Sequence, residues 1–342
     1  MTGLRVVDAG ETGALRSQAL WHGIAETMTG DSRPTLSFCR PTEPYVGLGY
    51  HRSLEELDAE SCSRRALAII RRRIGGGPVY IDDQQLFFQL SLPAAIAPAR
   101  VDLLYRRFLG PAVEAFRTLG IAAELRGLND ITVEDRKISG TGAGRIGDGV
   151  LVVGNVIFGF PHHRMTDALA FPSDSQAAEC LRLMRRHVSS LRDEGATGVT
   201  FEEAKETLTA SYAAELDLTP EAETTTPDEE VAIGGWERRF SDPRWLAGPS
   251  TPRRTGSLVK ISGDAWVWST SDAGVSLEAS IACGRIERLH VAGRGINGSS
   301  QRIAREIAGH SSDPTRVENT LHAHGIEGER IARLLGPGLR LH

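Results

Sequence analysis

Cysteine is scarce in this sequence, and long apolar runs are absent. The four cysteines, Cys39, Cys62, Cys180 and Cys283, lie far apart and form no Cys-x-x-Cys pair. This spacing argues against a disulfide framework and a zinc site, and it favours a reduced, cytoplasmic protein. No segment approaches the ~18 apolar residues that a membrane-spanning helix needs, so no membrane association is expected. The first residues also lack the basic and then apolar pattern of a secretion signal.

An excess of basic charge is also absent. Lys and Arg together number 39 and Asp and Glu 44, which gives a formal net charge of −5. Nucleic-acid binders usually carry a basic excess, so nucleic acid is not an expected partner. Hydrophobic residues make up 40% and charged residues 24% of the chain, as in ordinary globular proteins. Because 342 residues exceed what one core usually serves, we expect two domains in a monomeric chain.

The order of helical and strand-like patterns predicts a large α/β domain followed by a small α+β domain. Residues 1–228 alternate the two patterns and form the predicted large domain. The acidic, Thr- and Pro-rich stretch Asp217–Glu230 has the composition of a linker, and residues 229–254 are predicted to be a linker and crossing segment. Residues 255–342 predict a small antiparallel sheet with three short helical segments.

One short stretch, Arg71–Asp82, places three arginines directly before three glycines and reads RRRIGGGPVYID. Glycine loses more backbone entropy on folding than other residues, so a triple glycine needs a reason. No Gly-Lys-Ser/Thr follows, which excludes a P-loop. The functional interpretation is a backbone cradle for a phosphate or carboxylate, closed by one or two arginines. The alternative is a plain hairpin turn with a solvated arginine face.

A second stretch, Arg126–Arg145, reads RGLNDITVEDRKISGTGAGR. Its GTGAG segment follows a charged hairpin and opens no apolar helix, which argues against a dinucleotide-binding fingerprint. Lys137 lies between the Asn129-Asp130 pair and the small residues Ser139 and Gly140. Small residues let a ligand lie against the backbone while a lysine ammonium binds a carboxylate or a phosphate. A surface lysine in a turn is the alternative.

Taken together and in this order, RRRIGGGPVYID, the Asn-Asp pair and DRKISGTGAGR resemble the lipoate–protein ligase family. That family shares its fold with biotin protein ligases and with lipoyl and octanoyl transferases. The resemblance covers most of the chain and implies an α+β fold. A large biotin/lipoate-ligase-like α/β catalytic domain with mixed and antiparallel sheets would span residues 1–228. A small α+β accessory domain would span residues 255–342.

The resemblance also implies roles for single residues. Lys137 corresponds to the family's essential lysine, which contacts the acyl carboxylate and later the acyl-AMP. Asn129 and Asp130 match a pair associated with the nucleotide and magnesium, with Asp130 as the implied Mg²⁺ ligand. The implied residues that bind the acyl group and adenylate are Arg72, Gly75, Gly76, Gly77, Val79, Ser139 and Gly140.

The implied activity is ATP-dependent ligation. Lipoate and MgATP would give lipoyl-AMP, and lipoyl would pass to a lysine of a lipoyl carrier domain. A dehydrogenase E2, the glycine-cleavage H protein or a specialised lipoyl-binding protein could supply that domain. The alternatives are acyl transfer between carrier proteins, which in relatives uses a cysteine, and a non-catalytic binder of lipoate or a carrier.

Two departures from the family pattern leave the choice between lipoate and octanoate open. Ile74 stands where members usually have serine. The segment Gly147–Val153 lacks a histidine that many members carry.

Overall fold

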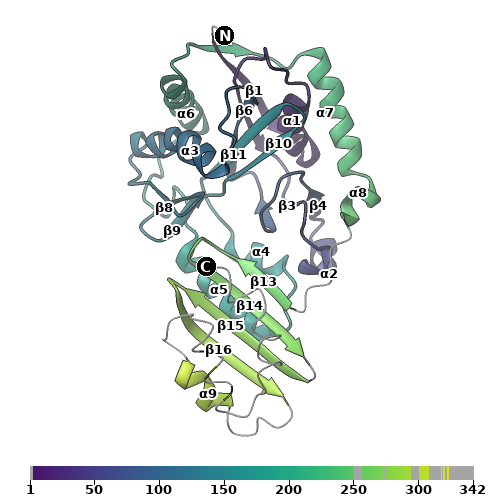
Figure 1. The fold of residues 1–342 in the computed structure, drawn as a ribbon, viewed down its shortest axis with the longest axis vertical. Coiled ribbons are helices and arrows are strands. Elements are labelled where there is room, and N and C mark those ends of the chain that lie inside the picture. The colour runs from purple at the N-terminus through teal and green to yellow at the C-terminus, as the bar shows by residue number, and fades with distance from the viewer. Residues whose placement is uncertain are drawn as a thin grey trace. The chain divides into compact units, whose positions relative to one another are not determined.

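The computed structural model describes residues 3–249, 256–272, 274–293 and 300–307, together with residues 317, 319 and 322. The chain forms two compact units (Figure 1). Unit 1 comprises residues 1–169 and 188–250, and unit 2 comprises residues 170–187 and 251–342. Among the described residues, no helix is both long and apolar enough to cross a membrane.

A six-stranded sheet in the order β10-β11-β6-β2-β1-β12 is the centre of unit 1. The strands are β1 (Leu4–Thr12), β2 (Thr35–Pro41), β6 (Gln85–Pro93), β10 (Gly142–Ile146), β11 (Gly149–Ile157) and β12 (Pro220–Glu223). β1 runs parallel to β2 and β12, whereas the other neighbouring pairs are antiparallel. The sheet is therefore mixed.

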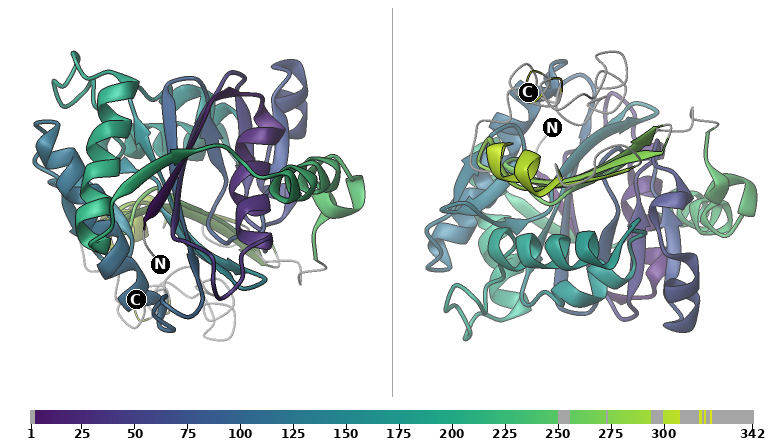
Figure 2. Two further views of the ribbon diagram at one scale, coloured as in Figure 1. Left: turned by 90° about the horizontal axis from the view of Figure 1, so that it is seen from above. Right: turned by 90° about the horizontal axis from the view of Figure 1, so that it is seen from below.

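Helices cover both faces of this sheet (Figure 2, left). They are α1 (Ala14–Glu26), α3 (Val101–Thr118), α6 (Phe201–Leu216) and α7 (Pro227–Phe240). Successive strand residues point to opposite faces. Phe88 on β6 accordingly packs in the core with α3 and α6, whereas its neighbour Phe87 packs against the core built with α1 and α7.

Two small sheets in unit 1 carry the conspicuous motifs. The first has the order β4-β3-β5, and the glycine loop connects β4 to β5; the second has the order β7-β8-β9 and carries Lys137. Their strands are β3 (Tyr45–Leu48), β4 (Ala68–Arg71), β5 (Val79–Ile81), β7 (Glu124–Arg126), β8 (Asp130–Val133) and β9 (Arg136–Ser139). The short helices of this unit are η1 (Leu54–Glu56), α2 (Ala59–Arg64), α4 (His162–Asp167) and α8 (Pro243–Ala247).

Unit 2 is a four-stranded antiparallel sheet with helices α5 (Asp174–His187) and α9 (Ser300–Ile307). Its strands follow in sequence order as β13 (Gly256–Lys260), β14 (Ala265–Asp272), β15 (Val275–Ala282) and β16 (Arg285–Gly293). The predicted fold class, α+β with mixed and antiparallel sheets, is confirmed. Of the three predicted C-terminal helical segments, the last two lie largely outside the described residues.

The observed units differ from the predicted domains in two places. Residues 170–187 group with the C-terminal sheet, because Glu179 of α5 accepts a hydrogen bond from Ser280 of β15 at 2.6 Å. Residues 229–250 group with unit 1, because α7 buries Ile233, Trp236 and Phe240 in the core that contains α1. The stretch predicted to be a linker and crossing segment is thus largely helical.

The acidic stretch Asp217–Glu230 is also ordered, and its interpretation as a linker is wrong. β12 pairs with β1, and the Thr226 hydroxyl caps α7. Arg5, which is buried, donates hydrogen bonds of 2.6 and 2.7 Å to the carboxylate of Glu229. The acidic side chains are counter-charges for arginines that are distant in sequence, a pairing that composition does not reveal.

Candidate functional site

Lys137 is held by an ion pair within the small β7-β8-β9 sheet. Its Nζ lies 2.7 Å from Oδ1 of Asp130, whose side chain is 4% exposed, while the lysine side chain is 20% exposed. The two residues come from paired antiparallel strands, β8 and β9. The carbonyl of Lys137 accepts a hydrogen bond of 2.8 Å from the backbone of Ser189. The strand therefore holds an ammonium beside a buried carboxylate and leaves part of it accessible.

The residues around Lys137 are positioned by short polar contacts. Asn129 donates from Nδ2 to the carbonyl of Thr141 at 3.2 Å, and the Thr141 hydroxyl donates back to the Asn129 carbonyl. The backbone N–H of Gly140 donates to Oδ1 of Asn155 at 2.6 Å. The Ser139 hydroxyl is buried and has no hydrogen-bond partner among the described residues. An unsatisfied buried hydroxyl on the lysine strand is uncommon and calls for an explanation.

Arg72 stabilises the glycine loop from inside. Its guanidinium donates to the carbonyls of Gly47, Gly75 and Gly77 at 2.9, 2.9 and 2.8 Å. Burial lowers the pKa of Arg72 to about 10. We predicted that this side chain lies along the acyl group, but backbone carbonyls occupy its donors in this structure. Its observed contribution is to order the loop.

The three glycines of the loop serve different purposes. Gly76 has φ of +99°, and a Cβ there would lie 2.6 Å from Nη2 of Arg72. At Gly75 and Gly77, by contrast, no atom lies within 4 Å of where a Cβ would be. Val79, just beyond the loop, is 38% exposed. One glycine is thus required by the fold, whereas the other two leave open space beside the backbone.

Ile74, at the position of the family's serine, packs on strand β10. Its side chain is 5% exposed. A Cβ at Gly142 would lie 3.0 Å from it, and one at Gly144 would lie 2.5 Å from it. Gly142 and Gly144 of the GTGAG segment therefore make room for Ile74.

Sequence reasoning missed His22, which lies beneath the arginine-glycine segment. Its Nε2 accepts the backbone N–H of Arg73 at 3.1 Å, so Nδ1 carries the proton and donates to the Gln18 carbonyl at 2.6 Å. Burial lowers the pKa of His22 to about 3, so the ring is neutral. A histidine inside an apolar helical pattern gives no signal of this contact, because its partner lies 51 residues away.

Three of the four thiols of this chain are poorly suited to nucleophilic attack. Burial raises the pKa of Cys39 and of Cys180 to about 12 in each case, and it also raises that of Cys62. Cys283 is exposed but lies in unit 2, after β15. A nucleophilic thiol needs a lowered pKa. The described residues also contain no group of three potential metal ligands.

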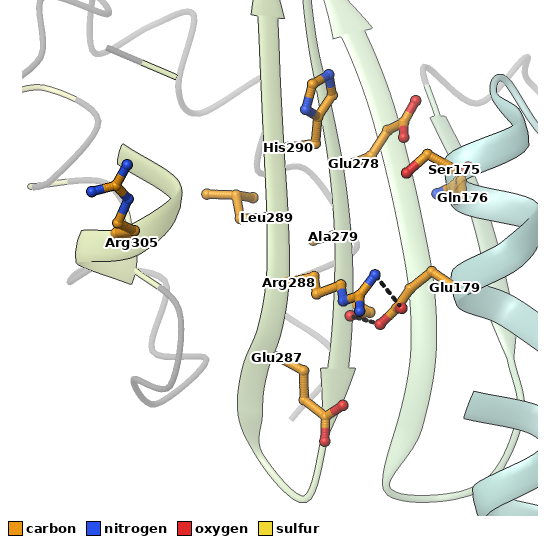
Figure 3. A pocket seen from close by; sticks show the side chains of 11 residues that line it. Ser175, Gln176, Glu179, Glu278, Ala279, Glu287, Arg288, Leu289, His290 and Arg305 are labelled. Atoms are coloured by element: carbon orange, nitrogen blue, oxygen red, sulfur yellow. Dashed lines mark hydrogen bonds and ion pairs between the residues drawn. The ribbon is translucent and has the colours of Figure 1, made fainter. Parts of the chain in front are cut away.

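A cavity of about 290 Å³ lies within unit 2, between α5 and strands β15 and β16 (Figure 3). Its lining includes Glu179, whose carboxylate is paired with Arg182, Ser280 and Arg288. The cavity contains none of the predicted site residues. The carboxylate of Glu179 already has hydrogen-bond and ion-pair partners on α5 and the sheet, so this carboxylate contributes to the packing of α5 on the sheet.

Unit 1 contains a mixed sheet flanked by helices, the lysine hairpin and the glycine loop. A sequence profile described as the lipoyl protein ligase A/B catalytic domain matches residues 14–213. The chain belongs to this enzyme family. Membership does not decide which reaction this chain catalyses, because both ligases and transferases are among the similar sequences.

The similar sequences include both ligases and transferases. Lipoate-protein ligase LplJ of Bacillus subtilis is 26% identical over 213 residues, which cover 61% of this chain and 63% of LplJ. The chain thus spans less than two thirds of that relative. Octanoyltransferase LipM of Geobacillus kaustophilus is 24% identical over 271 residues, covering 70% of this chain and 96% of LipM.

Solved structures support the fold. A bi-partite lipoate protein ligase from Thermoplasma acidophilum, described with its E2 lipoyl domain, has a TM-score of 0.67 at 21% identity and covers 74% of this chain and 99% of its own. A lipoate-protein ligase A bound with ATP has a TM-score of 0.62 at 22% identity, covering 72% of this chain and 99% of its own.

Proposed function

We propose that this protein is an ATP-dependent lipoate–protein ligase that acts on a lysine of a lipoyl carrier domain. The observation that carries the proposal is the Lys137–Asp130 ion pair, on the strand that also carries the unsatisfied Ser139 hydroxyl. A compact ammonium fixed in place can neutralise the charge that develops when a carboxylate attacks a phosphate. The backbone left open at Gly75 and Gly77 gives the adenylate room to approach.

The reaction has two steps. A carboxylate oxygen of lipoate attacks the α-phosphorus of ATP, and the bond to pyrophosphate breaks. The acceptor lysine then attacks the acyl carbon of lipoyl-AMP as a free amine, an amide bond forms and AMP leaves. Lys137 would bind the carboxylate and α-phosphate in the first step and the bridging oxygen in the second. The site would act by positioning and charge neutralisation.

Magnesium is implied by the family, and the residues present fit it. Mg²⁺ is usually held by one or two carboxylates together with substrate phosphates, and Asp130 with neighbouring Asn129 offers such a set. When bound, the ion would neutralise phosphate charge. Asp130 already neutralises Lys137 at 2.7 Å. This carboxylate would therefore serve both cations.

The cysteines favour ligation over thiol-dependent acyl transfer. Three of the four thiols are buried with raised pKa values. No cysteine occurs between Cys62 and Cys180, the interval that contains both motifs. The transferase alternative draws its support from the LipM relatives, one of which is matched over 96% of its length.

The decisive experiment is lipoate-dependent exchange between ATP and pyrophosphate without an acceptor protein. We expect exchange with the wild-type chain and a large loss for Lys137→Ala. Lys137→Arg keeps the positive charge but replaces the compact ammonium with a planar guanidinium. Lys205→Ala is the matched control, because Lys205 pairs with Asp8 and Glu202 away from the motifs. If no lipoate or other short or medium acid supports exchange, while acyl transfer between carriers proceeds, the transferase alternative is correct.

A further inference from the structure

A chain of buried hydrogen bonds connects the lysine strand to the strand that follows the glycine loop. Gly140 donates from its backbone to Oδ1 of Asn155 at 2.6 Å. Asn155 donates from Nδ2 to Oε1 of Gln85 at 2.7 Å. Gln85 donates from Nε2 to the carbonyl of Tyr80 at 3.1 Å. Gly140 directly follows β9, which carries Lys137, and Tyr80 lies in β5, three residues beyond Gly77.

Each amide in this chain has a fixed orientation. The Gly140 N–H requires the oxygen of Asn155, so the Asn155 nitrogen must face Gln85. The Tyr80 carbonyl likewise requires the nitrogen of Gln85, so its oxygen faces Asn155. Flipping either amide would set two donors or two acceptors against each other. The position of Gly140 relative to Tyr80 therefore depends on the donor-to-acceptor direction of each hydrogen bond as well as on its length.

Stability alone gives little reason for two amides at these positions. Asn155 is 7% and Gln85 1% exposed. A buried amide must recover its desolvation cost through hydrogen bonds, whereas an aliphatic side chain in the same space gains from burial directly. Gln89, on the same strand as Gln85 and also buried, shows the contrast. It bonds to Ser37 at 2.8 Å and to the Cys39 sulfur, both on β2, and neither carries a motif.

We infer that Asn155 and Gln85 are positioning residues that set the spacing between the Lys137 strand and the glycine loop. Their assignment to acyl adenylation rests on the proposed function, whereas the mechanical connection does not. Without Asn155, Gly140 loses its acceptor, and without Gln85, Asn155 loses the partner that orients its amide. In either case the end of β9 can shift relative to β5. Displacements of about 1 Å in a site that works by positioning cost roughly 10²-fold in rate.

The test compares Gln85→Met with Gln89→Met in the full chain. Both changes remove a buried amide from β6 and keep a similar volume, so both should lower the unfolding midpoint. Only Gln85→Met should lower kcat for lipoate-dependent pyrophosphate exchange, by about tenfold or more, with KM for lipoate changed less than about threefold. Equal kinetic effects in the two variants would show that Gln85 contributes packing only.

A second readout does not depend on any activity. Hydrogen–deuterium exchange of a peptide covering residues 138–142 should accelerate in Gln85→Met and more strongly in Asn155→Ala, and it should be unchanged in Gln89→Met. Unchanged protection in Asn155→Ala overturns the inference whatever the reaction is. The wild-type protein could show no ATP–pyrophosphate exchange while hydrogen–deuterium exchange of the three variants follows the expected pattern. In that case the hydrogen-bond connection between β9 and β5 holds and the proposed function fails. The kinetic comparison then moves to the acyl-transfer assay.

Discussion

Lys137 and Asp130 form a close ion pair across neighbouring strands, with Nζ 2.7 Å from Oδ1. The carboxylate is almost completely buried, whereas the ammonium is one-fifth exposed. A buried charge that loses its partner is costly, because neither water nor another cation replaces it. The proposed catalytic group is therefore also part of what stabilises the β8-β9 hairpin.

Replacing Lys137 should thus affect stability as well as activity. We expect Lys137→Met to lose about 3 kcal/mol of unfolding free energy, because the buried Asp130 carboxylate loses the ammonium that lies 2.7 Å from it. Adding Asp130→Asn should restore most of this stability without restoring adenylation. Urea unfolding of the two single variants and the double variant measures the coupling. A Lys137→Met protein as stable as the wild type would show that the pair contributes no stability.

Ile74 and Gly144 should be energetically coupled. A Cβ at Gly144 would lie 2.5 Å from Cγ2 of Ile74, so Gly144→Ala should cost about 1–3 kcal/mol through overpacking. In an Ile74→Ala background the same change should be nearly neutral, since the space is then vacant. A double-mutant cycle by urea unfolding tests this. Equal costs in both backgrounds would mean that Ile74 does not require the glycine.

A matched pair of helical glycines tests the contact between α1 and α7. A Cβ at Gly23 of α1 would lie 2.7 Å from the backbone nitrogen of Ile233 on α7, so Gly23→Ala should force the helices apart and destabilise by ~1–3 kcal/mol. At Gly235 of α7 the nearest atom, from Arg238, is 3.9 Å away. Gly235→Ala should therefore stabilise by up to about 1 kcal/mol through helix propensity. If thermal unfolding showed that both variants gain stability or that both lose it, the contact between α1 and α7 would be contradicted.

The sequence predicted those features whose signals are local. The sequence predicts a helix near Phe201–Leu216 and a strand over Thr35–Arg40, and the structure has a helix at Phe201–Leu216 and a strand at Thr35–Pro41. Lys137 and Asp130 lie within one short stretch, and the structure brings them together. The role of Arg72 could not be predicted in the same way. An arginine beside glycines suggests an anionic ligand, and nothing in the sequence shows that backbone carbonyls accept its hydrogen bonds.

Long-range contacts explain the other differences. The stretch SLEELDAESCSRRA, with Ser53 and Glu56 at capping-box spacing, predicts a single helix. The capping box is present, but Leu57 bridges Leu169 in extended conformation, and the stretch forms η1 and α2 instead. Asn155 and Gln85 are separated by 70 residues. Single polar residues in apolar strands give no periodic signal, so only the folded structure shows that they connect two motifs.

Cysteine replacement tests the ligase assignment from the opposite direction. Cys62 and Cys180 are buried with raised pKa values, so Cys62→Ser and Cys180→Ser should lower stability at most. Both variants should still lipoylate an acceptor domain when ATP is present. Mass spectrometry of the wild-type chain incubated with acyl donor should detect no thioester. An acylated cysteine whose replacement abolishes turnover would assign the protein to the thiol-dependent transferases.

His22 should make the protein sensitive to mild acid. Burial among Trp21, Trp236 and Phe240, together with the nearby charges of Arg72, Arg73 and Arg239, lowers the pKa of His22 to about 3. In the unfolded chain the ring has an ordinary pKa of ~6.5, so the unfolded state binds the extra proton first. The associated stability is complete above that value and decreases as the pH falls toward 3.

Between pH 6.5 and pH 5, this one group should therefore cost up to about 2 kcal/mol of unfolding free energy. His22→Gln retains an acceptor for the Arg73 N–H but carries no titrating group. Its stability at pH 7 can be lower, yet its stability should change less steeply with pH across this window. Urea unfolding of both proteins at matched pH values gives the two slopes, in which the carboxylates of the chain contribute equally. Identical slopes would show that His22 is protonated in the folded protein, and the hydrogen bond from Arg73 to Nε2 could then not form as observed.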